Sequence, residues 1–172
     1  HMLHVLRRNV DLQILLFNNE IYGLTKGQYS PTSQTGTRTP SSPTGSIDLP
    51  LAPCVVAIGS GGTFIARTID TQAKHLGAVV TRGHEHRGTS FIEILQNCPI
   101  YNDGIFNQVT DKKIAADFKV ELVQGEPIVF GKERELGIRL NHDSLKLEVV
   151  DATSDDVLIH DETNKVLATL LA

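Results

Sequence analysis

The sequence predicts an α/β protein with a mainly parallel sheet, followed by a C-terminal α+β extension. Three apolar runs, residues 12–17, 63–69 and 89–96, alternate with two segments of helical character. Near-continuous apolar strands that alternate with helices are typical of a parallel sheet covered on both faces. The pattern changes after residue 100, so we expect residues 1–100 and 101–172 to be separate parts of the protein.

Three helices are expected in the first part. Residues 2–8 would form the end of a helix, because two arginines in its last turn suit the negative end of the helix dipole. Residues 52–59 suit a short helix that ends in glycine. A longer helix is expected from the N-cap Thr71 to residue 87, since its apolar positions recur at helical spacing and Gly88 follows.

Residues 18–50 form a long segment without hydrophobic period, rich in Pro, Ser, Thr and Gly. Compact domains seldom keep a structureless loop of this length unless it is functional or disordered. The segment begins where the strand 12–17 ends, and ligands of open parallel sheets bind beyond the carboxyl ends of the strands. This makes it the first place to look for a site.

The last third of the chain offers short elements. We expect a helix near residues 112–118 and a final helix over 162–172. The strand candidates between them are residues 119–123, 127–131, 136–140, 145–150 and 156–161.

Composition narrows the class of protein. The chain has 172 residues, a formal charge of −4 and 40% hydrophobic residues, which suits one domain with a core, with or without a small appendage. Nothing gives the basic surface that nucleic acid requires. No apolar run approaches the roughly 20 residues that span a bilayer, and there is no secretory signal, so a cytoplasmic protein is expected. Cys54 and Cys98 are expected to be free thiols.

Asn18 and Asn19 open the long segment directly after a strand. A carboxamide oxygen suits Mg²⁺, which usually keeps phosphate oxygens among its ligands, and a backbone carbonyl can add another oxygen. Asn19 and the carbonyl of Ile21 would then face one metal ion. The alternative is a polar turn in which Asn18 or Asn19 bonds its own backbone, the commoner arrangement for an arbitrary Asn-Asn pair.

Lys26 and Cys98 are further candidates. Lys26 can pair with an anionic substrate while Gly27 lets the backbone come close, but most lysines are simply solvated. Cys98 follows the strand 89–96 and is expected at the same sheet edge as Asn19. A lone cysteine there is either a small buried hydrophobe or one thiolate of a metal cluster. No Gly-x-Ser-x-Gly, His-Glu-x-x-His or Walker motif supports a hydrolase or nucleotidase.

Five stretches together resemble the β subunit of 2-oxoacid:ferredoxin oxidoreductases, most nearly the 2-oxoglutarate type. They are "HMLHVLRRNVDLQILLFNNEIYGLTKGQYSPTS", "GSIDLPLAP", "TFIARTID", "HEHRGTSFIEILQNCPIYNDGIF" and "EPIVFG". The first contains "NNEIYGLTKGQYSPTS", which is highly specific for that family. The resemblance implies that residues 1–100 are the C-terminal part of a three-layer thiamin diphosphate-binding domain, with 18–50 as its cofactor and substrate loop. Residues 101–172 would be the β subunit's extension.

The resemblance also implies an activity. Such enzymes use thiamin diphosphate (thiamine pyrophosphate) and Mg²⁺ to decarboxylate a 2-oxoacid, pass electrons through a [4Fe–4S] cluster to ferredoxin and transfer the acyl group to coenzyme A. The β subunit works in a hetero-oligomer with an α subunit. Pyruvate or a branched-chain 2-oxoacid remains the alternative substrate to 2-oxoglutarate.

Site residues follow from the same resemblance. The family's metal ligands correspond here to Asn19 and the Ile21 carbonyl. Lys26 corresponds to a residue near the carboxylates of the 2-oxoacid, and Cys98 to the last of four cluster ligands. The cofactor-binding turn comprises Asn19, Ile21, Tyr22, Gly23 and Thr25.

The sequence also departs from the family pattern. It lacks the upstream Gly-Asp-Gly-Asp motif, which supplies a metal ligand, and the Cys-rich segment with its Cys-x-x-Cys. We therefore expect this chain to be the C-terminal portion of a longer subunit, inactive alone and unable to bind either cofactor tightly. The alternative is a non-catalytic module that keeps only subunit-docking surfaces.

Overall fold

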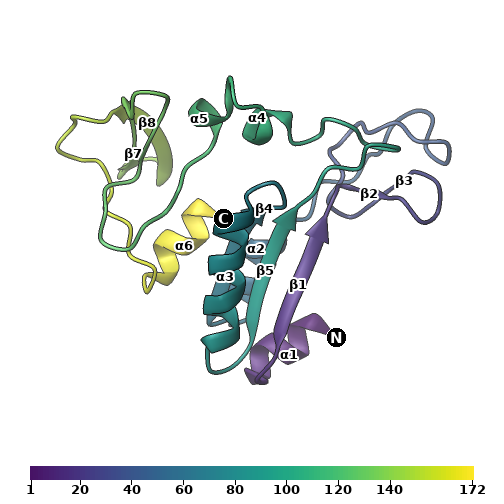
Figure 1. The fold of residues 1–172 in the computed structure, drawn as a ribbon, viewed down its shortest axis with the longest axis horizontal. Coiled ribbons are helices and arrows are strands. Elements are labelled where there is room, and N and C mark those ends of the chain that lie inside the picture. The colour runs from purple at the N-terminus through teal and green to yellow at the C-terminus, as the bar shows by residue number, and fades with distance from the viewer. The chain divides into compact units, whose positions relative to one another are not determined.

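Three parallel strands form the sheet of the N-terminal unit, in the order β1-β5-β4 (Figure 1). The computed structural model describes all of residues 1–172 and divides them into two units, His1–Phe106 and Asn107–Ala172. The parallel pairing confirms the sheet that the three apolar runs predict. The strands are β1 (Gln13–Asn18), β4 (Phe64–Ile69) and β5 (Ser90–Leu95).

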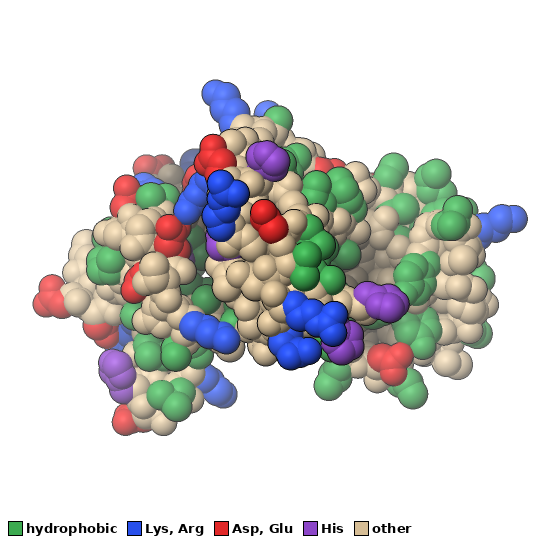
Figure 2. Space-filling view, turned by 90° about the horizontal axis from the view of Figure 1, so that it is seen from below, with side chains coloured by type: hydrophobic (Ala, Val, Ile, Leu, Met, Phe, Trp, Pro, Cys, Tyr) green, Lys and Arg blue, Asp and Glu red, His purple; other side chains and the backbone are tan.

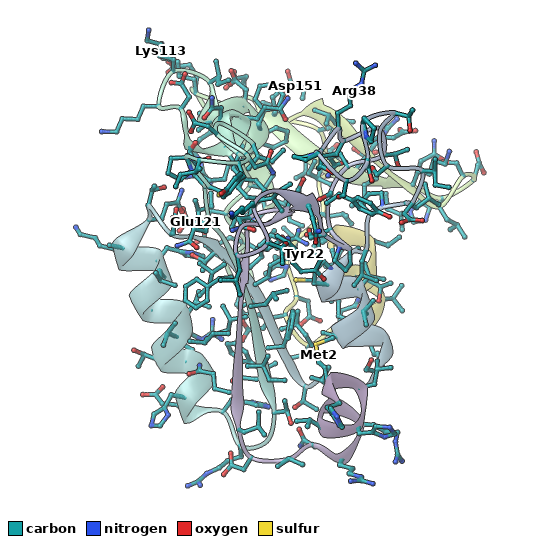
Figure 3. All side chains as sticks on the ribbon, turned by 90° about the vertical axis from the view of Figure 1, so that its right-hand side faces the viewer. Met2, Tyr22, Arg38, Lys113, Glu121 and Asp151 are labelled. Atoms are coloured by element: carbon teal, nitrogen blue, oxygen red, sulfur yellow. The ribbon has the colours of Figure 1, made fainter.

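Helices cover both faces of this sheet. Figure 3 shows the sheet edge-on, with α3 (Ala73–Glu85) on one side and α2 (Pro53–Gly59) on the other. Pro53 suits the first turn of α2 because the amide of that position has no helical partner. The predicted cap of α3 is wrong by one residue: Gln72 is the N-cap, and it makes no side-chain cap bond.

The core of the unit is centred on β5. Its residues Phe91, Ile92 and Ile94 are at most 1% exposed. Ser90 and Ile92 face α3, where a Cβ on Gly83 would lie 3.3 Å from Ser90 Oγ and 3.0 Å from Ile92 Cδ1. The alternate residues of β5 therefore point toward the face covered by α2.

The two edge strands differ from β5 in having one neighbour each. β1 pairs only with β5, and its Leu15 and Phe17 side chains are 39% and 57% exposed. β1 is preceded by α1 (Met2–Arg8), which ends at Asn9 in the left-handed conformation, φ 49°. The last turns of α1 and α3 carry basic side chains, which the negative end of the helix dipole favours. Figure 2 shows Lys, Arg and His side chains on the face seen from below.

The long segment 18–50 is held by hydrogen bonds and contains little regular structure. Its one hairpin joins β2 (Ile21–Tyr22) to β3 (Gln28–Tyr29). Farther along, the Gly36 amide donates to the Ser46 carbonyl at 2.8 Å, and the Leu51 amide donates to the Pro31 carbonyl at 2.8 Å. The segment thus folds back on itself before α2 begins.

The second unit combines a three-stranded antiparallel sheet, in the order β6-β7-β8, with short helices. The side chain of Asn164 caps its last helix by accepting from the amides of Val166 and Leu167, both at 3.0 Å. The elements are α4 (Asn107–Thr110), α5 (Ala115–Phe118), β6 (Val129–Phe130), β7 (Leu136–Asn141), β8 (Lys146–Asp151) and α6 (Lys165–Leu171).

Two predicted strands of this unit are wrong. Residues 119–123 alternate in polarity but pair with no strand. Residues 156–161 form only an isolated bridge between Ile159 and Pro127. Alternation alone does not supply a partner, and an extended segment becomes a strand only when a neighbour completes its hydrogen bonds.

The sequence placed the division of the chain at residue 100, whereas the two units divide after Phe106. None of the helices combines the length and the apolar composition of a membrane-spanning segment.

Two glycines of α3 should respond in opposite ways to the same substitution. A Cβ on Gly83 would lie 2.5 Å from Gln13 Nε2, so we expect Gly83→Leu to lower the free energy of unfolding by about 2–3 kcal/mol through overpacking. Gly77 has no heavy atom within 4 Å of its Cβ position, and Gly77→Leu should raise that free energy by about 0.7 kcal/mol through helix propensity. Urea unfolding followed by circular dichroism measures both, and equal effects would contradict the packing described.

Candidate functional site

The carboxyl ends of β1 and β5 lie side by side and carry the segments that the sequence singled out. Asn18 pairs with Leu95 in the sheet register. Beyond the strands, the Asn102 side chain donates to the Asn19 carbonyl at 3.0 Å, and Asn102 forms a bridge with Cys98. Asn19 and Cys98 therefore lie at the same end of the sheet, as their positions after two parallel strands predict.

A polar turn follows β1. Asn18 Oδ1 accepts from the Glu20 amide at 3.1 Å, and Asn19 Oδ1 accepts from the Ile21 amide at 3.3 Å. The side-chain carboxamides of Asn18 and Asn19 thus both make the local backbone hydrogen bonds that the polar-turn alternative describes. A carboxamide oxygen has two lone pairs, so Asn19 Oδ1 keeps one for a further partner. Such a neutral oxygen beside a turn of backbone carbonyls fits a hard cation such as Mg²⁺.

The next turn contains Tyr22, Gly23 and Thr25. The Gly27 amide donates to the Tyr22 carbonyl at 3.0 Å, and Thr25 Oγ1 approaches the same carbonyl at 3.4 Å. Figure 3 places Tyr22 at the end of the sheet where the strands finish. The structure therefore brings the five predicted cofactor-binding residues into two consecutive turns.

Lys26 lies at the tip of that turn. Its side chain is exposed, and its φ of 66° is in the left-handed region that residues with a Cβ seldom adopt. Gly27 has a φ of 89°, and a Cβ there would lie 2.9 Å from Tyr101 Cδ1. Glycine is required because the Tyr101 ring closes against the backbone.

A buried carboxylate lies beneath these turns. Glu93, on the middle strand, is 2% exposed. Its Oε2 accepts from Arg67 Nε at 2.8 Å and from Cys54 Sγ at 3.3 Å, and its Oε1 accepts from Asn18 Nδ2 at 2.8 Å. Sequence reasoning missed this group, although a lone acid in the apolar run "SFIEIL" was a signal, because a buried charge needs partners.

The segment 30–34 closes over the first turn and was also missed. Thr32 Oγ1 donates to Asn18 Oδ1 at 2.7 Å, and Ser33 Oγ donates to the Glu20 carbonyl. Gln34 Nε2 lies 3.2 Å from Glu20 Oε2. Partial burial raises the pKa of the Glu20 carboxyl, the Gln34 hydrogen bond opposes that rise, and the nearby Glu93 charge adds to it.

A shallow cavity of about 640 Å³ lies beside Tyr22, lined also by Tyr29, Asp48, Leu49 and Leu51. A hydrogen bond to Asp48 raises the pKa of the Tyr29 hydroxyl, and the Asp48 charge adds to that rise. Several large apolar side chains of the first unit have little cover, among them Leu24 (99% exposed), Ile47 (90%) and Ile100 (79%). These three side chains therefore contribute little to the core of the unit.

The chain supplies one thiol to this end of the sheet. Both cysteines are free, and Cys54 bonds to Glu93 instead of approaching Cys98. No group of three or more His, Cys, Asp or Glu side chains is arranged to hold a metal ion. The residues present therefore do not fit an iron–sulfur cluster by themselves, because such a cluster needs four ligands.

The two cysteines should differ in reactivity. Burial raises the pKa of the Cys54 thiol to about 12, with the Arg67 charge opposing and the Glu93 charge adding to the rise. Thiol reagents attack the thiolate, and at pH 8 about one Cys54 side chain in ten thousand would be ionised. We expect a thiol-reactive dye at pH 8 to label one cysteine of the folded chain quickly and the second only after denaturation. Cys98→Ser should abolish the fast phase, and rapid labelling of that variant would contradict the assignment.

Comparison with known proteins gives the site a context. Residues 1–94 match the family described as thiamine pyrophosphate enzyme, C-terminal TPP binding domain. The chain is 44% identical over 162 residues to "2-oxoglutarate oxidoreductase subunit KorB" of Mycobacterium tuberculosis, which covers 94% of this chain and 43% of that protein. It is 42% identical over 114 residues to "2-oxoacid:ferredoxin oxidoreductase subunit beta" of Saccharolobus solfataricus, covering 66% of this chain and 37% of that protein.

A solved structure shares the fold. It is the 2-oxoglutarate:ferredoxin oxidoreductase from Magnetococcus marinus with 2-oxoglutarate, coenzyme A and succinyl-CoA bound; the TM-score is 0.61 at 32% identity, over 72% of this chain and 40% of that one. The chain thus spans about two fifths of the length of these relatives. The likeness confirms the predicted α/β class. The relatives named above are β subunits of 2-oxoacid:ferredoxin oxidoreductases or of a 2-oxoglutarate oxidoreductase. Since the family match covers more than half of its residues, the chain belongs to the family of the C-terminal TPP-binding domain of thiamine pyrophosphate enzymes.

Proposed function

We propose that this chain forms part of the β subunit of a 2-oxoglutarate:ferredoxin oxidoreductase, or 2-oxoglutarate synthase. The complete complex would oxidatively decarboxylate 2-oxoglutarate, form the acyl-CoA and pass electrons to ferredoxin. The observation that carries the proposal is the pair of turns after β1, which places Asn19, Ile21, Tyr22, Gly23 and Thr25 together at the carboxyl ends of two parallel strands. The family match supports thiamin diphosphate as the ligand.

Asn19 Oδ1 and the Ile21 carbonyl are the proposed Mg²⁺ ligands. Tyr22, Gly23 and Thr25 would hold the diphosphate side of the cofactor. When bound, thiamin diphosphate supplies the carbanion stabilisation that decarboxylation needs, and the protein orients it. The hydrogen bonds of the two turns already fix the backbone that would present these groups. Binding the cofactor would therefore cost little conformational entropy in this loop.

Lys26 is the proposed substrate-side residue. Its ammonium is an exposed point charge at the tip of the cofactor turn, suited to a carboxylate of the 2-oxoacid. A dicarboxylate such as 2-oxoglutarate has a second carboxylate for such a contact, which pyruvate lacks. The names of the Mycobacterium tuberculosis relative and of the Magnetococcus marinus structure both specify 2-oxoglutarate.

Cys98 is the proposed single ligand that this chain gives to a [4Fe–4S] cluster. The remaining ligands would come from other parts of the complex. An α subunit, ferredoxin and coenzyme A are the proposed partners in a cytoplasmic hetero-oligomer; the Magnetococcus marinus relative binds coenzyme A. Residues 1–100 would serve the cofactor, with 18–50 as its cofactor and substrate loop, and residues 101–172 would extend the subunit.

A second candidate function is a non-catalytic docking module. It is favoured by the absence of any group of three or more His, Cys, Asp or Glu side chains arranged to hold a metal ion. The uncovered side chains Leu24 and Ile47 suit such a role as well. Titration calorimetry of this chain with thiamin diphosphate and Mg²⁺ separates the two, because micromolar binding by the chain alone would exclude the module.

The activity is tested in a β subunit that contains this chain, assembled with its α subunit. We expect coenzyme A-dependent reduction of a viologen dye with 2-oxoglutarate, at a kcat/KM about tenfold or more above that with pyruvate or a branched-chain 2-oxoacid, because a charged hydrogen bond is worth about 1.5–3 kcal/mol. Lys26→Met should reduce that ratio. A far better rate with pyruvate would overturn the substrate assignment.

The two proposed ligand sets should separate in the same complex. Asn19→Ala should weaken Mg²⁺ binding about tenfold or more while the visible absorbance of the cluster stays, because the amide and the thiol serve different groups. Cys98→Ala should remove the absorbance and leave thiamin diphosphate binding largely intact. Each variant is the control for the other. If both variants lost both cofactors equally, these residues would act through folding instead.

A further inference from the structure

The two carboxylate oxygens of Glu93 have separate partners. Oε2 receives the Arg67 guanidinium at 2.8 Å and the Cys54 thiol at 3.3 Å. Oε1 receives only the Asn18 side chain, at 2.8 Å, among the bonds of this group. Oε2 thus binds the counter-ion on β4 and the neutral thiol on α2, and Oε1 binds the side chain at the end of β1.

This arrangement determines which way the Asn18 carboxamide points. An ionised carboxylate can only accept hydrogen bonds, so the NH₂ group of Asn18 must face Glu93. The carboxamide oxygen is then turned toward the loop, where it accepts from the Glu20 amide at 3.1 Å and from Thr32 Oγ1 at 2.7 Å. Turned the other way, the NH₂ group would meet the Glu20 N–H, which can only donate, and it would face no acceptor there except the Thr32 hydroxyl.

Glu20 is consequently held on both of its peptide sides. Asn18 Oδ1 binds its amide, and Ser33 Oγ donates to its carbonyl. Its φ of 54° is a left-handed conformation that such bonds must maintain. Glu20 lies between Asn19 and Ile21, so fixing it fixes the two residues whose oxygens are the proposed metal ligands.

We propose that Glu93 is a positioning residue, which acts through Asn18 to set the turn that presents Asn19 and Ile21 to Mg²⁺ and the diphosphate. This inference rests on the proposed function for its ligand and on the hydrogen bonds alone for its mechanism. A role in sheet stability would not require this polarity, because well-packed apolar residues serve a buried site as well as an ion pair does.

The first test uses Glu93→Gln in the β subunit assembled with its α subunit. A glutamine keeps the shape and removes the charge that orients Asn18. We expect Mg²⁺ affinity, titrated in the presence of thiamin diphosphate, to fall about 10–100-fold, as for other groups that orient metal ligands. The kcat at saturating Mg²⁺ should change much less than the Mg²⁺ concentration needed for half activity.

Gln13→Met is the matched control. Gln13 lies on β1, the strand that ends in Asn18. Its side chain donates to the Val80 carbonyl at 2.9 Å, on the face covered by α3. We expect this variant to lower the melting temperature without changing Mg²⁺ affinity. If Gln13→Met weakened Mg²⁺ binding as much as Glu93→Gln at the same loss of melting temperature, Glu93 would be a stability residue and the proposal would be wrong.

A reversed pair gives the sharper test. In Glu93→Gln/Asn18→Asp, the glutamine NH₂ faces the new carboxylate, which still accepts from Glu20 and Thr32, while the glutamine oxygen accepts from Arg67. We expect this double variant to regain most of the lost Mg²⁺ affinity. Asn18→Asp alone should lower Mg²⁺ affinity more than Glu93→Gln or the double variant does, since it places two carboxylates next to each other. Absence of rescue in a folded double variant would overturn the proposal.

Amide hydrogen exchange of the 172-residue chain, without cofactor, distinguishes failure of this inference from failure of the proposed function. Glu93→Gln should speed exchange at the Glu20 and Ile21 amides several-fold more than at β5, and the double variant should restore it. If the wild-type complex bound no Mg²⁺ while exchange behaved as expected, the proposed function would fail and the positioning role would stand. Unchanged exchange at Glu20 in Glu93→Gln would disprove the positioning role.

Discussion

Burying the Glu93 carboxylate in the middle strand places a demand on every element around it. A charge in a protein interior needs both a counter-ion and hydrogen-bond donors, and here they come from three directions: Arg67 on β4, Cys54 on α2 and Asn18 on β1. Since each donor belongs to a different element, this one carboxylate ties the side chains of both outer strands and of a helix to the middle strand. Through its bond to Asn18, the same carboxylate also sets the geometry of the turn after β1.

The loop above the sheet is stabilised differently. Its order comes from short polar side chains that bond to nearby backbone, such as Thr35 to the Asp48 carbonyl at 2.8 Å and Ser46 to the Gln34 carbonyl at 2.9 Å. Bonds of this kind give shape without a core, and they leave Leu24 almost fully exposed. A loop built in this way can hold polar ligand groups firmly while its apolar side chains remain available to another surface.

The sequence was informative where chemistry is local and repeated. Apolar runs predicted the three parallel strands, and the position of Asn19 and Cys98 after two of them predicted that both lie at one end of the sheet. Residues 119–123 show the limit, because alternation does not reveal whether a partner strand exists. Glu93 and Thr32 were missed for a related reason: their partners lie far away in sequence, at separations that no local pattern encodes.

The carboxamide of Asn18 is one small group on which the shape of the whole turn depends. Slow hydrolysis of an asparagine amide yields a carboxylate, and at this position the new charge would face Glu93 where a donor now lies at 2.8 Å. The change would add one unit of negative charge and very little mass, so the mass of the chain would hardly reveal that the turn after β1 had lost its hydrogen bonds. Such a change would disturb the turn at the end of β1 while the backbone pairing of β1 with β5 stayed as it is.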